Sequence, residues 1–254
     1  MAELPTSEAL GKKVFILNPP SVFEEDLLHE VLRHEYEIYL LRDTGAALRV
    51  FAKYPNSIAF INIDSGLNEE QWEKYIRRLK GDSKYRGLKI GVISYNPSPE
   101  LTQKYLMDIG IECGFVRLSL GSQESAKIVI RVLEANEAKG RRRYVRARCE
   151  KAPNTGFNLE YAGRQMSGPI LDISSVGAAI RLEPGNTLPP KSLVRKVQLR
   201  LRSRLVHLDA AVLGSRSDDP GVHILLFSGD GVEKQKKQIR HFIHKSLQAE
   251  IERV

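Results

Sequence analysis

The hydrophobic pattern of this 254-residue chain changes its period once, and that change limits the possible folds more than any other feature. Between residues 14 and 137, short apolar runs alternate with segments whose apolar residues recur at helical spacing. After Arg146, apolar and polar residues alternate in short runs separated by Gly, Pro, Asn, Asp and Ser. Alternating strands and helices favour a parallel sheet, whereas short strands without crossover helices favour an antiparallel barrel. We therefore predict two domains of different class.

The first domain is expected at residues 12–138, after a flexible N-terminus at 1–11. Its strands are predicted at 14–17, 36–41, 58–63, 88–94 and 115–118. Its helices are predicted over a segment that follows Ser21, then at 44–54, 68–80, 98–108 and 123–137. For this length and alternation, a flavodoxin-like arrangement with helices on both faces of the sheet is the natural expectation.

The second domain is expected at 147–254, joined to the first by an arginine-rich linker at 139–146. Its strands are predicted at 145–151, 157–161, 168–173, 178–182, 194–201, 205–214 and 222–227. A helix from about 231 to 252 follows, with an apolar stripe that either covers one barrel end or pairs with another copy.

The excess of positive over negative charge is confined to the second half. Residues 1–138 have 17 Lys and Arg against 20 Asp and Glu, while the remainder has 22 against 11. Four of these arginines fall within residues 141–146. Arginine offers phosphate a planar fork of donors and offers a base a flat stacking face, so a polyanionic ligand is one interpretation. A solvated, charged linker is the other.

Several other classes of protein are disfavoured. The two cysteines, Cys113 and Cys149, have no partners at metal-ligand spacing and form no disulfide framework. The N-terminus has no apolar signal-peptide core, and the apolar runs are too short to span a membrane, so we expect a cytoplasmic protein. We find no constellation of nucleophile, base and orienting group, and therefore expect no enzyme.

The order and spacing of the first half resemble a response-regulator receiver domain. That family uses a carboxylate cluster, a phosphoacceptor Asp, a Ser or Thr and a Lys. At the corresponding positions this chain has Asn18, Asn62, Ser94 and Ser119, and Asp64 substitutes for the acceptor only if the register shifts. We interpret this domain as a degenerate receiver that transfers no phosphoryl group. A phosphorylated regulator with a barrel output remains an alternative.

A second short element, Asp-Ile-Ser-Ser-Val-Gly at 172–177, lies between two predicted strands, and a tight turn alone explains it. Its glycine permits positive φ or close backbone approach. Combined with the arginines, however, it resembles the PilZ domain, a bacterial receptor module for cyclic di-GMP, over residues 141–254. By this resemblance the ligand residues are Arg141, Arg142, Arg146, Asp172, Ser174 and Gly177.

The resemblance implies an effector or adaptor that binds cyclic di-GMP, changes its interdomain arrangement, and acts through an unidentified downstream protein on a process such as motility or virulence. No metal or other cofactor is implied. The alternative is a nucleic-acid-binding regulator that uses the basic strand at 195–204, although a solvated outer face also explains that strand.

Overall fold

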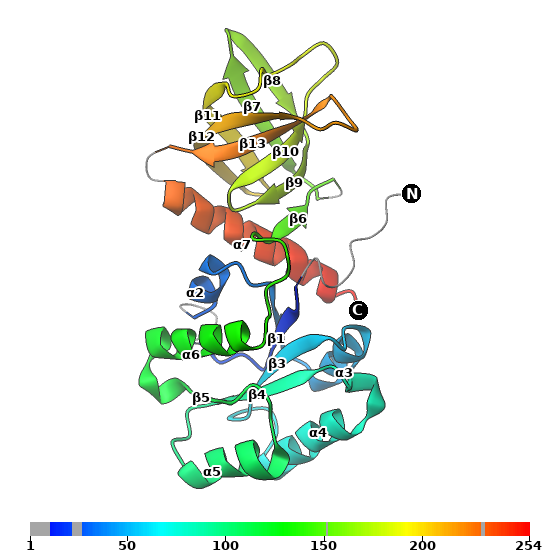
Figure 1. Ribbon diagram of the computed structural model, residues 1–254, viewed down its shortest axis with the longest axis vertical. Helices are drawn as coiled ribbons and strands as arrows, with labels where there is room; N and C mark the ends of the chain where they lie inside the picture. The colour runs from blue at the N-terminus through cyan, green and yellow to red at the C-terminus, as the bar shows by residue number, and fades with distance from the viewer. Residues whose placement is uncertain (1–10, 22–26, 151, 230–231) are drawn as a thin grey trace. The chain divides into compact units, whose positions relative to one another are not determined.

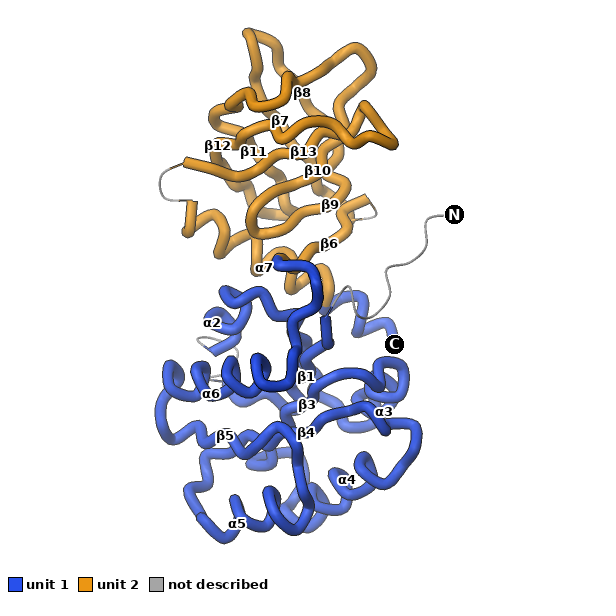
Figure 2. The backbone as a smooth tube through the Cα atoms, viewed as in Figure 1, with its two compact units in different colours: residues 1–143, 248–254 blue, residues 144–247 orange. Residues whose placement is uncertain are grey.

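The computed structural model describes residues 11–21, 27–150, 152–229 and 232–254 (Figure 1). The flexible N-terminus predicted at 1–11 lies, apart from Gly11, outside the described residues. The chain divides into two compact units (Figure 2). We call residues 1–143 with 248–254 the α/β unit, and residues 144–247 the β unit.

A five-stranded parallel sheet forms the centre of the α/β unit, with strand order β2-β1-β3-β4-β5. The strands are β1 Lys13–Leu17, β2 Ile38–Leu41, β3 Ser57–Asn62, β4 Lys89–Ser94 and β5 Phe115–Arg117. This is the predicted flavodoxin-like order, and its central strand β3 is buried along its whole length because helices cover both faces.

The described helices of this unit follow the predicted apolar spacing. They are α2 Leu28–Arg33, α3 Thr44–Lys53, α4 Glu69–Gly81, α5 Pro99–Gln103 and α6 Ser122–Ala135. Ser98 caps α5 by accepting from the Leu101 backbone N–H at 3.0 Å, and Pro99 occupies the first turn. The predicted helix at 98–108 is α-helical only in this first part, because residues Lys104–Ile109 continue it with π-helical bonding.

Eight strands form one antiparallel sheet in the β unit, with order β6-β9-β10-β13-β12-β11-β7-β8. They are β6 Arg146–Arg148, β7 Thr155–Tyr161, β8 Arg164–Gly168, β9 Ile170–Ser174, β10 Gly177–Arg181, β11 Leu193–Leu201, β12 Arg204–Ser215 and β13 Val222–Ser228. The sheet curves around a core of alternate side chains, which confirms the predicted antiparallel, barrel-like class.

Strand β8 was not predicted. It forms a hairpin with β7 through Ala162 and Gly163, which both have positive φ, at 50° and 75°. Two consecutive positive φ values are typical of the tight turn that matches strand twist. Alanine rarely occupies such a turn, and Met166 is the one core residue among those of β8, so the sequence showed neither the turn nor the strand.

The C-terminal helix α7, Val232–Ile251, covers the core of the β unit. Ile239, Phe242 and Ile243 are buried in the same cluster as the strand residues, so the covering role is the one observed. The last turn belongs to the α/β unit, where the Gln248 side chain bonds the backbone of the edge strand β2. Its Nε2 donates to Leu40 O at 2.8 Å, and its Oε1 accepts from Leu40 N at 2.9 Å.

Candidate ligand-binding site

The hairpin between β9 and β10 explains the spacing of the Asp-x-Ser-x-x-Gly element. Ser174 and Gly177 lie directly opposite one another, and only Ser175 and Val176 separate them. The Ser174 hydroxyl donates to Gly177 O at 3.2 Å and accepts from Val176 N at 3.4 Å. Ser174 is 5% exposed, so its hydroxyl bonds mainly to the turn itself.

Gly177 is required by close packing of the backbone. A Cβ atom at this position would lie 2.4 Å from the carbonyl oxygen of Leu225 on the neighbouring strand β13. Such a contact forces the strands apart, because real Cβ atoms essentially never approach an atom below 3.0 Å. Of the two explanations for this glycine, close approach is therefore the one observed.

Strand β6 places the last arginine of the linker beside this hairpin. Arg146 is opposite Ser174, and Arg148 is opposite Asp172, in an antiparallel register. Opposite residues of such a pair share a face, and Ala147 lies on the core side. Arg146 Nη1 is 3.6 Å from Asp172 Oδ1, and its side chain is 53% exposed.

Sequence reasoning missed a second arginine at Asp172. Arg216 follows β12, and its Nη2 donates to Asp172 Oδ2 at 2.6 Å. Two strands, β10 and β13, lie between β9 and β12 in the sheet, so no local pattern connects these residues. The Asp172 side chain is 21% exposed and has an arginine at each oxygen.

The predicted site residues are divided between the two units. Arg146, Asp172, Ser174 and Gly177 come together in the β unit. Arg141 and Arg142 are exposed residues of the coil between α6 and β6 and belong to the α/β unit. The contacts among Arg146, Asp172, Ser174 and Gly177 therefore belong to the part of the predicted site that lies in the β unit.

Cys149 lies close to this cluster but is buried, 2% exposed. Burial, with a smaller contribution from the Asp172 charge, raises the pKa of its thiol to about 12. The thiol therefore stays protonated near neutral pH and is no nucleophile. In the described part of the chain, no group of three His, Cys, Asp or Glu side chains is arranged to hold a metal ion.

At the carboxyl edge of the parallel sheet lie the residues that stand where a receiver domain has its phosphorylation site. Asn62, the last residue of β3, is 3% exposed and donates to Asn18 O at 2.9 Å. The Asp64 carboxylate accepts from Ser94 Oγ at 2.5 Å and from Tyr95 N at 2.7 Å. Both carboxylate oxygens are therefore bonded within the unit, and an amide stands at the predicted acceptor position.

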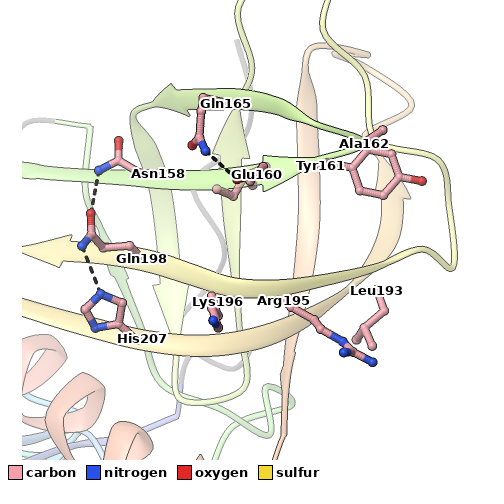
Figure 3. Close-up of a pocket in the computed structure, with 11 residues that line it drawn as sticks. Asn158, Glu160, Tyr161, Ala162, Gln165, Leu193, Arg195, Lys196, Gln198 and His207 are labelled. Carbon is pink, nitrogen blue, oxygen red and sulfur yellow. Dashed lines mark hydrogen bonds between the residues drawn. The ribbon is translucent and has the colours of Figure 1, made fainter.

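A pocket of about 640 Å³ opens on the outer face of strands β7, β8, β11 and β12 (Figure 3). Gln198 joins Asn158, at 2.8 Å, to His207, at 3.0 Å, in a hydrogen-bonded row of polar side chains across three strands. Arg195 and Lys196 both face outward because the ladder is irregular between Val194 and Val197. The predicted basic face therefore exists, but this hydrogen-bonded row separates Lys196 from Arg200 farther along the strand.

A membrane-spanning helix would need a long apolar run, and no helix of the described residues has one. No curated protein sequence matches the chain.

Solved structures resemble each half separately. The PilZ domain of YcgR from Escherichia coli, solved with c-di-GMP, matches 44% of this chain and 96% of its own, at 17% identity and TM-score 0.36. The K. pneumonia MrkH–c-di-GMP complex matches 46% of this chain and 56% of its own, at 22% identity and TM-score 0.37. The chemotaxis response regulator CheY4 of Vibrio cholerae matches 48% of this chain and 99% of its own, at 18% identity and TM-score 0.41.

The family comparison covers the arginine-rich stretch, the Asp172–Gly177 hairpin and most of α7 together. Residues 140–245 of this chain match the family model of the PilZ domain.

Proposed function

We propose that this protein is a cyclic di-GMP receptor that acts as an effector without catalysing a reaction. The observation that carries the proposal is the meeting of the two sequence elements on neighbouring strands. Arg146 and Asp172 are 26 positions apart in sequence, yet their side chains lie 3.6 Å apart on one exposed face. The match of residues 140–245 to the PilZ domain supports the same function.

The chemistry of these groups suits a cyclic guanine dinucleotide. Arginine side chains bond phosphate oxygens and the O6 and N7 acceptors of guanine, and also stack on purines. A carboxylate accepts from the N1–H and 2-amino donors of guanine. Under this proposal, Arg141, Arg142 and Arg146 bind the ligand together with Asp172, while Ser174 and Gly177 shape the turn that presents the carboxylate.

Calorimetric titration of cyclic di-GMP into the full chain tests the proposal. Each charge-assisted bond contributes about 1.5–3 kcal/mol, so Arg142→Ala and Arg146→Ala should each weaken binding by roughly 10- to 100-fold. Arg33→Ala is a suitable control, since Arg33 ends α2 in the α/β unit. If wild type gives no binding heat at ligand concentrations up to about 1 mM, a dissociation constant equivalent to about 4 kcal/mol of binding free energy, the proposal is contradicted.

We further propose that the ligand acts through the linker at 139–146 by fixing the arrangement of the two units. The arginines begin directly after Gly140, at Arg141, which is six residues after the end of α6 at Ala135. Close positive charges repel one another, and a ligand that neutralises them favours one arrangement by its differential affinity. X-ray scattering with and without saturating ligand should show changed dimensions, and identical profiles would leave the linker without this role.

The downstream process is also part of the proposal. A second-messenger receptor without a catalytic site must act on another molecule, and we propose a protein partner in a pathway such as motility or virulence. A strain that carries Arg146→Ala at the native locus should swim at the same rate as a strain in which the gene is deleted.

Nucleic acid remains the alternative partner. Arg195, Lys196 and Arg200 are exposed on the outer face of the β unit. Binding through phosphates would fall steeply with salt and would be lost in an Arg195, Lys196 and Arg200 triple alanine variant. If Arg146→Ala binds nucleic acid as tightly as wild type does, this result favours nucleic acid over the dinucleotide as the partner.

A further inference from the structure

Arg216 lies outside both elements of the predicted site, yet it is closer to Asp172 than Arg146 is. Its Nη2 donates to Asp172 Oδ2 at 2.6 Å, whereas Arg146 Nη1 is 3.6 Å from Oδ1. The distance to Arg216 is typical of a charge-assisted hydrogen bond, and the distance to Arg146 is too long for one. Arg216 therefore fixes the orientation of the carboxylate in this structure.

The backbone of Arg216 is itself held in place. Its N–H donates to Val222 O at 2.8 Å, at the start of the loop that joins β12 to β13. The side chain of Arg216 is 36% exposed and that of Asp172 is 21% exposed, so the pair is partly shielded from water. Such a pair is less screened than one on an open surface.

The charges around Asp172 do not balance. Arg146 and Arg216 lie at the two oxygens of Asp172, and a third arginine, the exposed Arg148, is opposite Asp172 in the β6–β9 register. These four groups together have a net charge of +2. A cyclic dinucleotide has two phosphates and a charge of −2, which this excess would neutralise.

We propose that Arg216 is a positioning residue of the dinucleotide site and sets its selectivity for guanine. This inference rests on the proposed function. A carboxylate has about four lone-pair positions, so Asp172 accepts from Arg216 and still has positions for the N1–H and 2-amino groups of a guanine. Without Arg216, the carboxylate turns toward Arg146, and its fit to the guanine edge is lost.

The experiment measures two ligands on four proteins by calorimetry. The ligands are cyclic di-GMP and cyclic di-IMP, whose hypoxanthine bases lack the 2-amino group that Asp172 is proposed to bind. The proteins are wild type, Arg216→Ala, Arg216→Lys and the control Arg181→Ala. Arg181, the last residue of β10, pairs at 2.7 Å with Asp219 in the same β12–β13 loop, so this control removes an ion pair that does not involve Asp172.

Wild type should prefer cyclic di-GMP by at least about tenfold, the difference made by one lost charge-assisted bond. Arg216→Ala should lose about tenfold in affinity for cyclic di-GMP and little for cyclic di-IMP, so that the preference disappears. Arg216→Lys should recover part of the preference, because an ammonium group also donates to the carboxylate. Arg181→Ala should resemble wild type, and matching thermal transitions show that all four proteins are folded.

Each contrary result has a separate meaning. If wild type binds neither ligand, the proposed function fails and this inference fails with it. If wild type prefers cyclic di-GMP and Arg216→Ala keeps that preference, the inference alone is overturned. Equal losses for both ligands also overturn it, since Arg216 would then contact the phosphates rather than orient Asp172.

Discussion

Replacing Gly177 by alanine should destabilise the β unit, even when no ligand is present. The added Cβ would lie 2.4 Å from Leu225 O, and ordinary contact begins at 3.4 Å, so β10 and β13 must separate by about 1 Å. Gly177 and Ala178 are opposite Leu226 and Leu225 in this ladder. A shift of that size stretches their hydrogen bonds beyond useful length.

The expected loss follows from these two effects. Overpacking costs about 1–3 kcal/mol, and each weakened ladder bond costs about 0.5–1.5 kcal/mol, which gives roughly 3 kcal/mol in total. For a unit of about 100 residues, 1 kcal/mol lowers Tm by 4–8 °C, so the transition should move down by roughly 12–24 °C.

Thermal unfolding followed by two signals tests this prediction. Far-UV circular dichroism reports the backbone of both units, whereas the fluorescence of Trp72, the one tryptophan of the chain, reports the α/β unit alone. A transition seen by circular dichroism and not by fluorescence therefore belongs to the β unit. Gly221→Ala is the matched control, because a Cβ there has no contact closer than 3.4 Å and should leave Tm nearly unchanged. If Gly177→Ala unfolds at the same temperature as Gly221→Ala, the steric explanation of this glycine is wrong.

Three further predictions concern groups outside the proposed site. Asp64→Ala should lower the stability of the α/β unit by about 1–3 kcal/mol, because the buried Ser94 hydroxyl and the Tyr95 N–H lose their acceptor. Denaturant titration measures this loss. A small phosphodonor should label neither wild type nor the variant. The Cys149 thiol, whose pKa burial raises to about 12, should react with a disulfide reagent at pH 8 only after unfolding, and fast reaction of native protein would contradict its burial. Burial, together with the charges of Arg204 and Lys245, lowers the pKa of His241, so its NMR titration midpoint should lie below 6.5 and should rise in Arg204→Gln. Because the unfolded histidine binds its proton at a higher pH than the folded one, the free energy of unfolding should fall as pH drops from about 6.5 through the folded pKa.

Most of the fold could be predicted because burial imposes a period on the sequence. The strand order β2-β1-β3-β4-β5 follows from alternating strands and helices, and the strands of the β unit follow from period-two patterns. The pattern could not show β8, since a strand with one core residue and a turn at Ala162 leaves little trace. Nor could it show the bond from Gln248 to Leu40, whose residues are 208 positions apart.

The candidate site was only partly predictable for a similar reason. Arg146 and Asp172 were found because each belongs to a short local pattern. Arg216 belongs to none, and it reaches Asp172 from the loop after β12, a strand that is not a hydrogen-bonded neighbour of β9. Contacts of this kind depend on how the sheet curves, which no local pattern in the sequence specifies.

The fold explains some residues of the candidate site and leaves others to be explained by a ligand. Gly177 is fixed by the carbonyl of Leu225, and the buried hydroxyl of Ser174 is occupied by the turn, so the fold alone accounts for both. The fold does not account for Arg146, whose side chain is 53% exposed and pairs with Asp172 only at long range. Binding lost in Gly177→Ala or Ser174→Ala is therefore ambiguous between unfolding and loss of contact. Binding lost in Arg146→Ala, at unchanged Tm, is the result that a charged ligand requires and that a purely structural role for this cluster does not produce.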